Sequence, residues 1–316
     1  MTKCLVPSEF PTKVHAPNAC ANGKPGFPRT GKRDKIPTHV AVLNCMKARL
    51  PIWAFPILSF ICCAAPSSDP AISNHPAPAT QPVPRTDPNS RLAHEQLVQK
   101  ARKGGIDIFF VGDSITRRWG AADPQYRHLL GNWKTNFFGW NAANFGWGAD
   151  RIENILWRLQ NGELDGVNPK IIVVLAGINN VGTEPGDSQK VEDITRGLKT
   201  IVDVCQTKAS NATIILTAIF PRNDHLAVIP TINQINRNLA ALADGKRLRF
   251  LDLNDKLADQ EGRLFPGMMN ADQLHPTVRG YQLWADALKP IFTEILGPPA
   301  KTDHAPPPTG DPSAMR

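Results

Sequence analysis

Residues 106–118 read IDIFFVGDSITRR, and this stretch decides the fold. Residues 106–111 are a short run of β-forming residues, which is typical of a strand buried on both faces in a parallel sheet. Gly112 permits a sharp exit, so Ser114 is expected where this strand ends and a helix begins. Because α/β sheets place their chemistry at the carboxyl ends of strands, Ser114 is a candidate nucleophile. The alternative is that Asp113 and Ser114 only cap the helix.

The rest of the chain alternates strand-like and helix-like segments. Residues 170–176 (KIIVVLA) are the clearest central strand, and residues 151–160 carry apolar side chains at helical spacing. The other expected strands are residues 142–145, 213–220 and 249–253, and the other expected helices are residues 89–103, 119–130, 191–206, 229–242 and 277–296. This alternation predicts an α/β fold whose parallel sheet is covered on both faces.

The net charge of +8 lies almost entirely in the N-terminal segment. Residues 1–65 contain nine Lys or Arg and two Asp or Glu, whereas the remaining residues contain 27 and 26. The nearly neutral body shows no basic stripe with interleaved aromatic residues, so we expect no nucleic-acid partner. Five of the six cysteines also precede residue 66, which leaves Cys205 alone in the body without a disulfide partner or a metal-ligand spacing.

The two ends of the chain differ in composition from the body. Residues 1–45 show no sustained apolar period, and we expect a disordered segment or a mis-called extension ahead of a true start at Met46. Residues 46–65 combine a basic start, an apolar run and small residues, which predicts a signal peptide and therefore export to the periplasm, the cell envelope or the medium. Residues 66–88 predict a Pro-rich linker, residues 89–296 the folded domain, and residues 297–316 a disordered tail.

Other interpretations of the apolar run stay open. It could be an uncleaved anchor, a buried segment, or the leader of a lipoprotein acylated at Cys62 or Cys63. Residues 50–65 are short for a membrane span and contain two prolines, so we expect no stable span.

Polar residues follow three of the expected strands and precede the last helix. Ser114, Ala149 and Asn179 come after the first, second and third strands, and Asp272 and His275 lie just before the final helix. A serine needs a base to become a nucleophile, so His275 could take its proton while Asp272 holds the imidazole tautomer. The backbone N–H groups of Ser114 and Ala149 and the amide of Asn179 are candidate oxyanion donors. Each residue alone also fits a turn, a cap or a surface loop, so the prediction depends on their joint occurrence.

Four segments together resemble the SGNH/GDSL hydrolase superfamily, and within it the platelet-activating-factor acetylhydrolase catalytic subunits and their bacterial relatives. They are residues 112–114 (GDS), 144–150 (NFGWGAD), 177–180 (GINN) and 272–276 (DQLHP), and the resemblance covers about residues 106–291. It implies a three-layer flavodoxin-like SGNH hydrolase fold with a five-stranded parallel sheet. It also implies a Ser-His-Asp esterase that needs no metal or other cofactor.

The resemblance makes Ser114 the nucleophile, His275 the base, Asp272 its partner and Asn179 an oxyanion donor. One position departs from the family pattern, because Ala149 stands where a glycine usually precedes the Asp of the second segment. Its backbone N–H can still serve if φ is negative. If φ is positive the Cβ strains the turn, and Gly148 is the fallback donor.

We therefore expect an exported serine esterase that removes a short acyl group such as acetyl from a small-molecule or polysaccharide ester. The short-acyl preference follows from the resemblance alone. The alternatives are a lysophospholipase or thioesterase with the same catalytic residues, and a catalytically silent carbohydrate-binding module on the same fold. The sequence carries no signal for the alcohol part of the substrate or for the oligomeric state.

Overall fold

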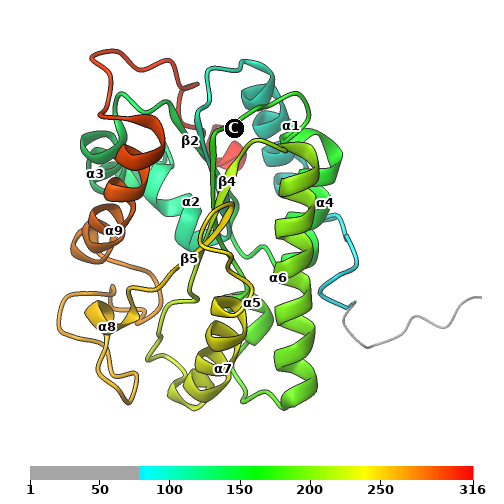
Figure 1. Cartoon of the computed structure of the whole chain (residues 1–316), viewed down its shortest axis with the longest axis vertical. Coiled ribbons are helices and arrows are strands. Elements are labelled where there is room, and N and C mark those ends of the chain that lie inside the picture. Colours follow the sequence, from blue (N-terminus) through cyan, green and yellow to red (C-terminus); the bar gives the residue numbers. More distant parts are fainter. Residues whose placement is uncertain (1–77, 316) are drawn as a thin grey trace, which may run out of the picture. The chain divides into compact units, whose positions relative to one another are not determined.

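The computed structural model describes residues 78–315, at whose centre lies a five-stranded sheet with all strands parallel (Figure 1). The strands are β1 (Ile108–Gly112), β2 (Ala142–Gly146), β3 (Ile171–Leu175), β4 (Thr213–Thr217) and β5 (Leu248–Leu251). Their order in the sheet is β2-β1-β3-β4-β5. The chain adds β2 on one side of β1 and then adds β3, β4 and β5 on the other side, so the topological switch point lies between β1 and β3. Doubly wound sheets place ligands at this switch point. The predicted α/β fold with a five-stranded parallel sheet is confirmed.

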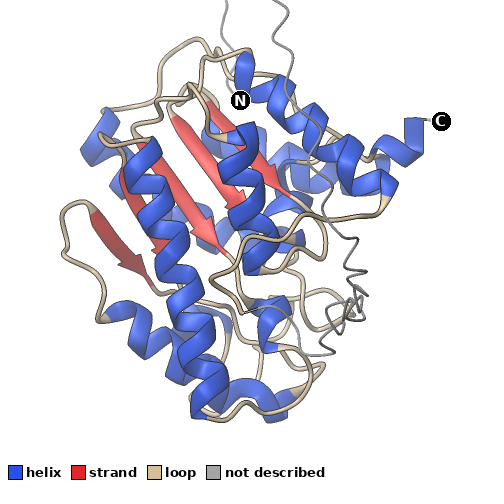
Figure 2. Cartoon of the chain, turned by 90° about the vertical axis from the view of Figure 1, so that its right-hand side faces the viewer, coloured by secondary structure: helices blue, strands red, loops and turns tan. Residues whose placement is uncertain are grey.

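Helices cover both faces of the sheet and make the second and third layers (Figures 1 and 2). One side carries α1 (Pro88–Arg102), α4 (Ile152–Arg158), α6 (Ser188–Lys208) and α7 (Ile229–Ala240), and the other carries α2 (Ser114–Gly120), α3 (Arg127–Phe137) and α9 (Val278–Leu296). The short helices α5 (Ile178–Val181) and α8 (Asn254–Leu257) follow β3 and β5. Single turns η1 (Pro124–Tyr126), η2 (Leu159–Glu163), η3 (Leu226–Val228) and η4 (Pro312–Met315) complete the described elements.

An aromatic cluster fixes helix α2, which begins at Ser114. Trp119 of α2 stacks on Trp284 of α9 with 5.0 Å between the ring centroids, and Phe110 of β1 packs edge-on against Trp133 of α3 at 4.7 Å. All of these rings are buried. Phe110 also packs edge-on against Trp119 at 6.1 Å, and such pairs add to the free energy gained by burying the rings, so α2 is held against β1. Holding α2 in this way gives the first residue of that helix a fixed position.

Most expected elements occur within a few residues of their predicted bounds. The largest difference is the helix expected over residues 119–130, because α2 already ends at Gly120 and α3 begins only at Arg127. The end of β4 differs as well. The expected strand over residues 213–220 ends at Thr217. Ala218 N–H still donates to Leu251 O of β5 at 2.8 Å, but Ile219 N–H donates to Asn236 Oδ1 at 2.8 Å, so the chain leaves the ladder there. The buried apolar run therefore continues beyond the strand without being part of the sheet.

The Pro-rich tail after α9 is ordered, which corrects the disorder expected for residues 297–316 over the part the structure describes. Trp140 Nε1 donates to Gly297 O at 3.0 Å, and Ala122 N–H donates to Thr309 O at 3.0 Å. Proline has little backbone freedom to lose, so a few such bonds suffice to hold the tail against the body. A composition that buries little apolar surface can thus still follow one path.

The end of the expected linker is also packed. Ala79 is fully buried, and its N–H donates to Asp193 Oδ2 of α6 at 3.0 Å. Val83 N–H donates to Glu153 O of α4 at 2.9 Å. Composition predicted no contacts here, because it does not show which single residues fit a neighbouring helix.

The expected extension (residues 1–45), signal peptide (46–65) and first part of the linker (66–77) lie outside the described residues. Within residues 78–315, no helix is both long and apolar enough to cross a membrane. The same residues contain no group of three His, Cys, Asp or Glu side chains placed to hold a metal ion. Cys205 is buried and has a free thiol.

Candidate active site

Ser114 lies at the sharp bend between β1 and α2. A Cβ at Gly112 would come within 2.2 Å of Leu175 O on the neighbouring strand, so only glycine fits the end of β1. Asp113 then caps α2, its Oδ1 accepting from Ile115 N–H at 2.9 Å. The capping role proposed as the alternative for this stretch thus belongs to Asp113 and leaves the half-buried Ser114 hydroxyl free for other contacts.

The loop before α9 carries Asp272 and His275. Asp272 Oδ1 accepts from the backbone N–H groups of Leu274 at 3.1 Å and His275 at 2.9 Å, which closes a tight turn. Asn270 Nδ2 holds the turn from the other side by donating to His275 O at 3.0 Å and Pro276 O at 2.9 Å. These bonds orient the imidazole before any substrate is present.

The structure brings Ser114, His275 and Asp272 into one chain of contacts. Ser114 Oγ lies 2.8 Å from His275 Nε2 across a separation of 161 residues, and His275 Nδ1 lies 2.9 Å from Asp272 Oδ2. Both distances are within hydrogen-bond reach, as proton transfer between a hydroxyl and a base requires. With the proton on Nδ1 held by the carboxylate, Nε2 is free to accept the serine proton.

Burial is the main influence on the pKa of His275, which it lowers, and the nearby Arg118 cation lowers it further. Asp272 and Asp224 oppose this shift. For Asp272, partial burial acts to raise the pKa, but the hydrogen bonds from the His275 and Leu274 backbone outweigh it and bring the pKa to about 2. At neutral pH the arrangement therefore holds a carboxylate beside a neutral imidazole.

Arg118 also belongs to this site and was not among the residues predicted from the sequence; its Nη1 lies 3.2 Å from Asp272 Oδ2. One signal could have found it, because residues four apart on a helix share a face and Arg118 is four residues after Ser114. A cation one turn along α2 from the serine lies on the same helix face and can therefore reach the residues that contact the serine.

Asn179 reaches the same edge of the sheet from the end of β3. Gly177 has φ +107°, a left-handed conformation that turns the chain directly into α5. Asn179 Nδ2 donates to Asp150 O at 2.8 Å, which leaves its second amide hydrogen available for a ligand.

Ala149 adopts the strained conformation, with φ +60°. Its side chain is exposed, so the methyl group meets solvent, and the strain is that of a left-handed alanine, about 1–2 kcal/mol. Among the described residues, no hydrogen-bond acceptor takes the backbone N–H of Ser114, Gly148 or Ala149. Both the first choice of donor, Ala149, and the fallback, Gly148, therefore have a free N–H in this turn.

A buried ionic network underlies the turn after β2. Arg158 Nε lies 2.7 Å from Asp150 Oδ2, and the same guanidinium contacts Glu163, which in turn contacts His94. Burial raises the pKa of Asp150 to about 6 although Arg158 acts to lower it. Arg158 Nη1 also donates to Phe145 O at 3.1 Å, so the network ties the end of β2 to α4.

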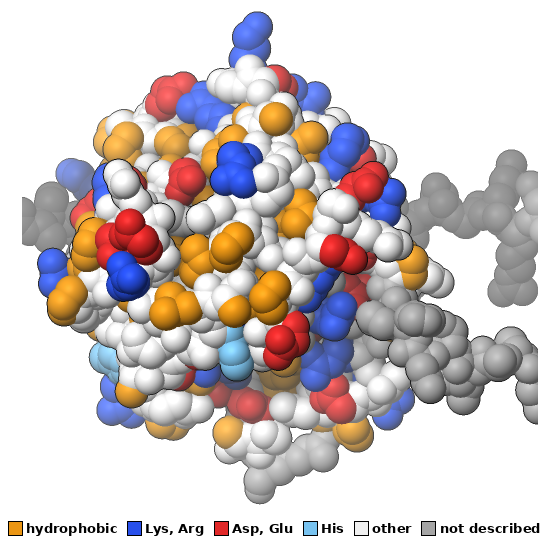
Figure 3. Space-filling model, turned by 90° about the horizontal axis from the view of Figure 1, so that it is seen from below, with side chains coloured by type: hydrophobic (Ala, Val, Ile, Leu, Met, Phe, Trp, Pro, Cys, Tyr) orange, Lys and Arg blue, Asp and Glu red, His pale blue; other side chains and the backbone are white. Residues whose placement is uncertain are grey.

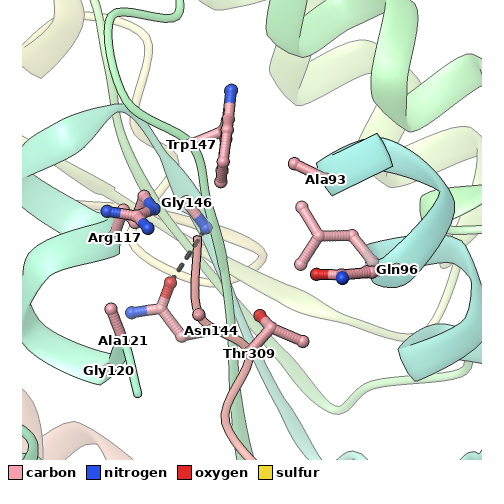
Figure 4. A pocket seen from close by; sticks show the side chains of 11 residues that line it. Ala93, Gln96, Arg117, Gly120, Ala121, Asn144, Gly146, Trp147 and Thr309 are labelled. Atoms are coloured by element: carbon pink, nitrogen blue, oxygen red, sulfur yellow. Dashed lines mark hydrogen bonds between the residues drawn. The ribbon is translucent and has the colours of Figure 1, made fainter. Parts of the chain in front are cut away.

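Asn144 fixes the same strand end from its other side, next to a small pocket between β2 and α1 (Figure 4). Its Oδ1 accepts from Gly146 N–H at 2.9 Å, and its Nδ2 donates to Thr116 O of α2. The Asn144 side chain thereby joins the second sequence segment to α2, the helix that begins at Ser114.

Comparison with known proteins identifies the family to which the chain belongs. The model of the GDSL-like Lipase/Acylhydrolase family matches residues 110–283. The chain is 31% identical over 205 residues to the human platelet-activating factor acetylhydrolase IB subunit alpha1, covering 64% of this chain and 82% of that protein. It is 29% identical to the rat subunit alpha2, covering 64% and 83%.

A crystal structure of a GDSL-like lipase from Bacteroides thetaiotaomicron shares the fold, with a TM-score of 0.51, 18% identity, and coverage of 64% of this chain and 98% of that chain. The family match spans the segments that bear Ser114, Ala149, Asn179, Asp272 and His275. On these grounds the chain belongs to the GDSL-like lipase/acylhydrolase family and is a carboxylic ester hydrolase.

Proposed function

We propose that this protein is a serine esterase that removes short acyl groups, acetyl above all, through an acyl-enzyme on Ser114. The observation that carries the proposal is the 2.8 Å contact between Ser114 Oγ and His275 Nε2, with Asp272 2.9 Å behind the imidazole. A serine hydroxyl in contact with an oriented neutral imidazole is the arrangement that activates this nucleophile.

In the proposed first step, His275 Nε2 takes the hydroxyl proton while Ser114 Oγ bonds to the ester carbonyl carbon. The carbonyl oxygen becomes negative and is stabilised by the N–H groups of Ser114 and Ala149 and by Asn179 Nδ2. The tetrahedral intermediate collapses, the alcohol leaves with the proton from His275, and the acyl group stays on Ser114. In the second step a water gives one proton to His275 and its oxygen bonds to the acyl carbon. This second intermediate collapses, the bond to Ser114 Oγ breaks, Oγ takes the proton from His275, and the acid is released.

The acetyl preference is supported by the acetylhydrolase subunits that the chain resembles over 82% of their length. The alcohol part can be large, because Asp272 and Ala149 at the edge of the site are exposed. A small-molecule ester or an acetylated polysaccharide both fit such a site. If residues 46–65 act as a signal peptide, the polysaccharide would be one outside the cell membrane.

A longer-chain lipid or thioester substrate is the second candidate, and exposed apolar side chains favour it. Leu226 in η3, Phe265 in the loop after α8 and Val278 at the start of α9 are all exposed, in segments that follow β4 and β5. Figure 3 shows hydrophobic side chains lying among charged ones on the face seen from below. Such a surface could contact an acyl chain that extends beyond the reacting carbonyl.

The test combines a substrate series with one substitution. Nitrophenyl esters from acetate to palmitate should show the highest kcat/KM at acetate, and a long-chain optimum would favour the second candidate. S114A should lose at least about 1,000-fold in kcat, since the nucleophile is removed. S210A, which alters an exposed serine after α6, is the matched control and should retain full activity. Full activity in S114A would refute the mechanism.

A fluorophosphonate probe separates both candidates from a silent carbohydrate-binding module. The probe reacts only with an activated serine, so covalent labelling of the wild-type protein and none of S114A supports the esterase. Failure of the folded wild-type protein to react would favour the binding module.

A further inference from the structure

Arg85 contacts the turn after β2 although it lies outside the matched family region, in the segment expected to be a linker. Its Nη1 donates to Gly148 O at 3.2 Å and lies 3.4 Å from Asp150 Oδ1. Its Nη2 lies 3.0 Å from Asp87 Oδ2, and Asp87 caps α1 through Ser90 N–H at 2.8 Å. Arg85 therefore connects the start of a helix to the turn that bears Ala149.

The contact with Gly148 O determines the direction of the Ala149 N–H. These two groups belong to the same peptide unit, which is planar and trans, so its C=O and N–H point in opposite directions. Holding the Gly148 oxygen toward Arg85 directs the Ala149 N–H away from it. A cation on the carbonyl oxygen also polarises the peptide and makes its N–H a stronger donor.

The conformation of Ala149 explains why this peptide needs to be held. A φ of +60° disfavours alanine by about 1–2 kcal/mol. Rotating the Gly148–Ala149 peptide plane by half a turn would bring φ of Ala149 to the favoured negative side. The same rotation would point the N–H away from the site. The bond from Arg85 to Gly148 O opposes that rotation.

The second contact of Arg85 reaches the other proposed side of the oxyanion site. Asp150 accepts from Arg85 and Arg158 through its carboxylate, and its backbone oxygen accepts from Asn179 Nδ2 at 2.8 Å. Fixing Asp150 therefore also fixes the amide of Asn179. Both proposed donors outside α2 depend on the turn that Arg85 contacts.

We propose that Arg85 is a positioning residue of the oxyanion site, which holds the Gly148–Ala149 peptide so that the Ala149 N–H faces the reacting carbonyl. This inference rests on the esterase function proposed above. It assigns a role in catalysis to the segment before α1, ahead of the sequence that the family model matches.

The test is a double-mutant cycle between positions 85 and 149, with nitrophenyl acetate as substrate. R85Q should lower kcat about tenfold and change KM less than about twofold. The loss in kcat should be smaller than the roughly 10²–10³-fold loss that follows removal of an oxyanion donor, because in R85Q the donor is still present but less well oriented. R85K keeps a cation that can reach one oxygen and should recover part of kcat. R91Q, an exposed arginine on α1, is the control and should match wild type.

The A149G background distinguishes positioning from simple stabilisation. Glycine accepts positive φ without strain, so the peptide gains nothing by rotating and R85Q should cost about threefold or less there. A purely structural role would give the same loss in both backgrounds, and that result would overturn the proposal. The kcat of each variant is calculated per active site, and active sites are counted by fluorophosphonate labelling of Ser114. Unfolded protein does not react with the probe and therefore does not lower the measured kcat.

Failure of the proposed function gives a different outcome. If S114A is as active as wild type, the proposed esterase mechanism is wrong, and the role of Arg85 in positioning an oxyanion donor is wrong with it. If S114A is inactive and R85Q keeps the wild-type kcat, only the role of Arg85 is wrong.

Discussion

Arg118 and His275 share one hydrogen-bond acceptor, Oδ2 of Asp272, at 3.2 Å and 2.9 Å. The carboxylate thus balances two cations whenever the imidazole is protonated. Because Arg118 is always charged, it disfavours a second positive charge on His275. The arrangement favours the neutral imidazole, which is the form a general base requires.

We expect the acid limb of kcat/KM to lie below pH 6.5, the ordinary pKa of histidine. Burial and Arg118 lower the pKa of His275. Below that pKa the imidazole carries a proton and cannot accept another from Ser114, so the rate falls as pH falls; above it the rate is constant with respect to this group. Initial rates with nitrophenyl acetate between pH 4 and pH 8 measure the limb. A limb above pH 6.5 would contradict the assignment.

Replacing Arg118 should move that limb to higher pH. R118Q removes the cation that lowers the pKa of His275, while Asp272 continues to favour the protonated imidazole. The pH profiles of R118Q and wild type give the shift directly. R127Q is the control, because Arg127 is exposed on α3 and is not among the charges that act on His275. An unchanged limb in R118Q would mean that solvent screens the Arg118 charge.

The sequence was sufficient for the fold and for the residues that meet at the site. The strand run before Gly112 and the polar residues after successive strands follow from periodicity, and a parallel sheet necessarily brings those strand ends to one edge. Gly112 pairs with Gly146 of β2 and Leu175 of β3, which puts Ser114, Ala149 and Asn179 beyond the same row of residues.

Arg85 and the tail could not be predicted in this way. Both lie in Pro-rich segments, where composition indicates little burial, and their positions depend on single contacts with distant elements such as Gly148 O. The positive φ of Ala149 could not be predicted either, because alanine can adopt a positive or a negative φ and the positive one costs only about 1–2 kcal/mol. Long-range contacts and local strain depend on the folded neighbours, which a pattern of residue types does not describe.

Ala149 should be less favourable for stability than glycine. A149G removes a left-handed strain of about 1–2 kcal/mol and adds about 0.4–1 kcal/mol of unfolded-state entropy, so we expect the free energy of unfolding to rise by about 0.5 kcal/mol. A240G, at an exposed position in the last turn of α7, should instead lower it. Urea denaturation of both variants measures the two signs. A loss of stability in A149G would mean that φ at this turn is not strained.

Arg158 should be the most costly arginine to remove from the described body. R158M leaves the buried carboxylates of Asp150 and Glu163 without their shared cation, and breaking a buried ion pair from one side costs about 3–5 kcal/mol. R196M is the matched control, because Arg196 pairs with Glu192 on an exposed face of α6, where such pairs contribute about 0.5 kcal/mol or less.

Part of the stability lost in R158M should be recovered at low pH, since the pKa of Asp150 is already raised to about 6 and would rise further without Arg158. Once protonated, that carboxyl group no longer needs a cation beside it. The difference in the free energy of unfolding between wild type and R158M should therefore become smaller as pH falls from 8 to 5. Urea unfolding across this range checks it, and a gap that widens toward low pH would show that the lost charge pair is not what destabilises R158M.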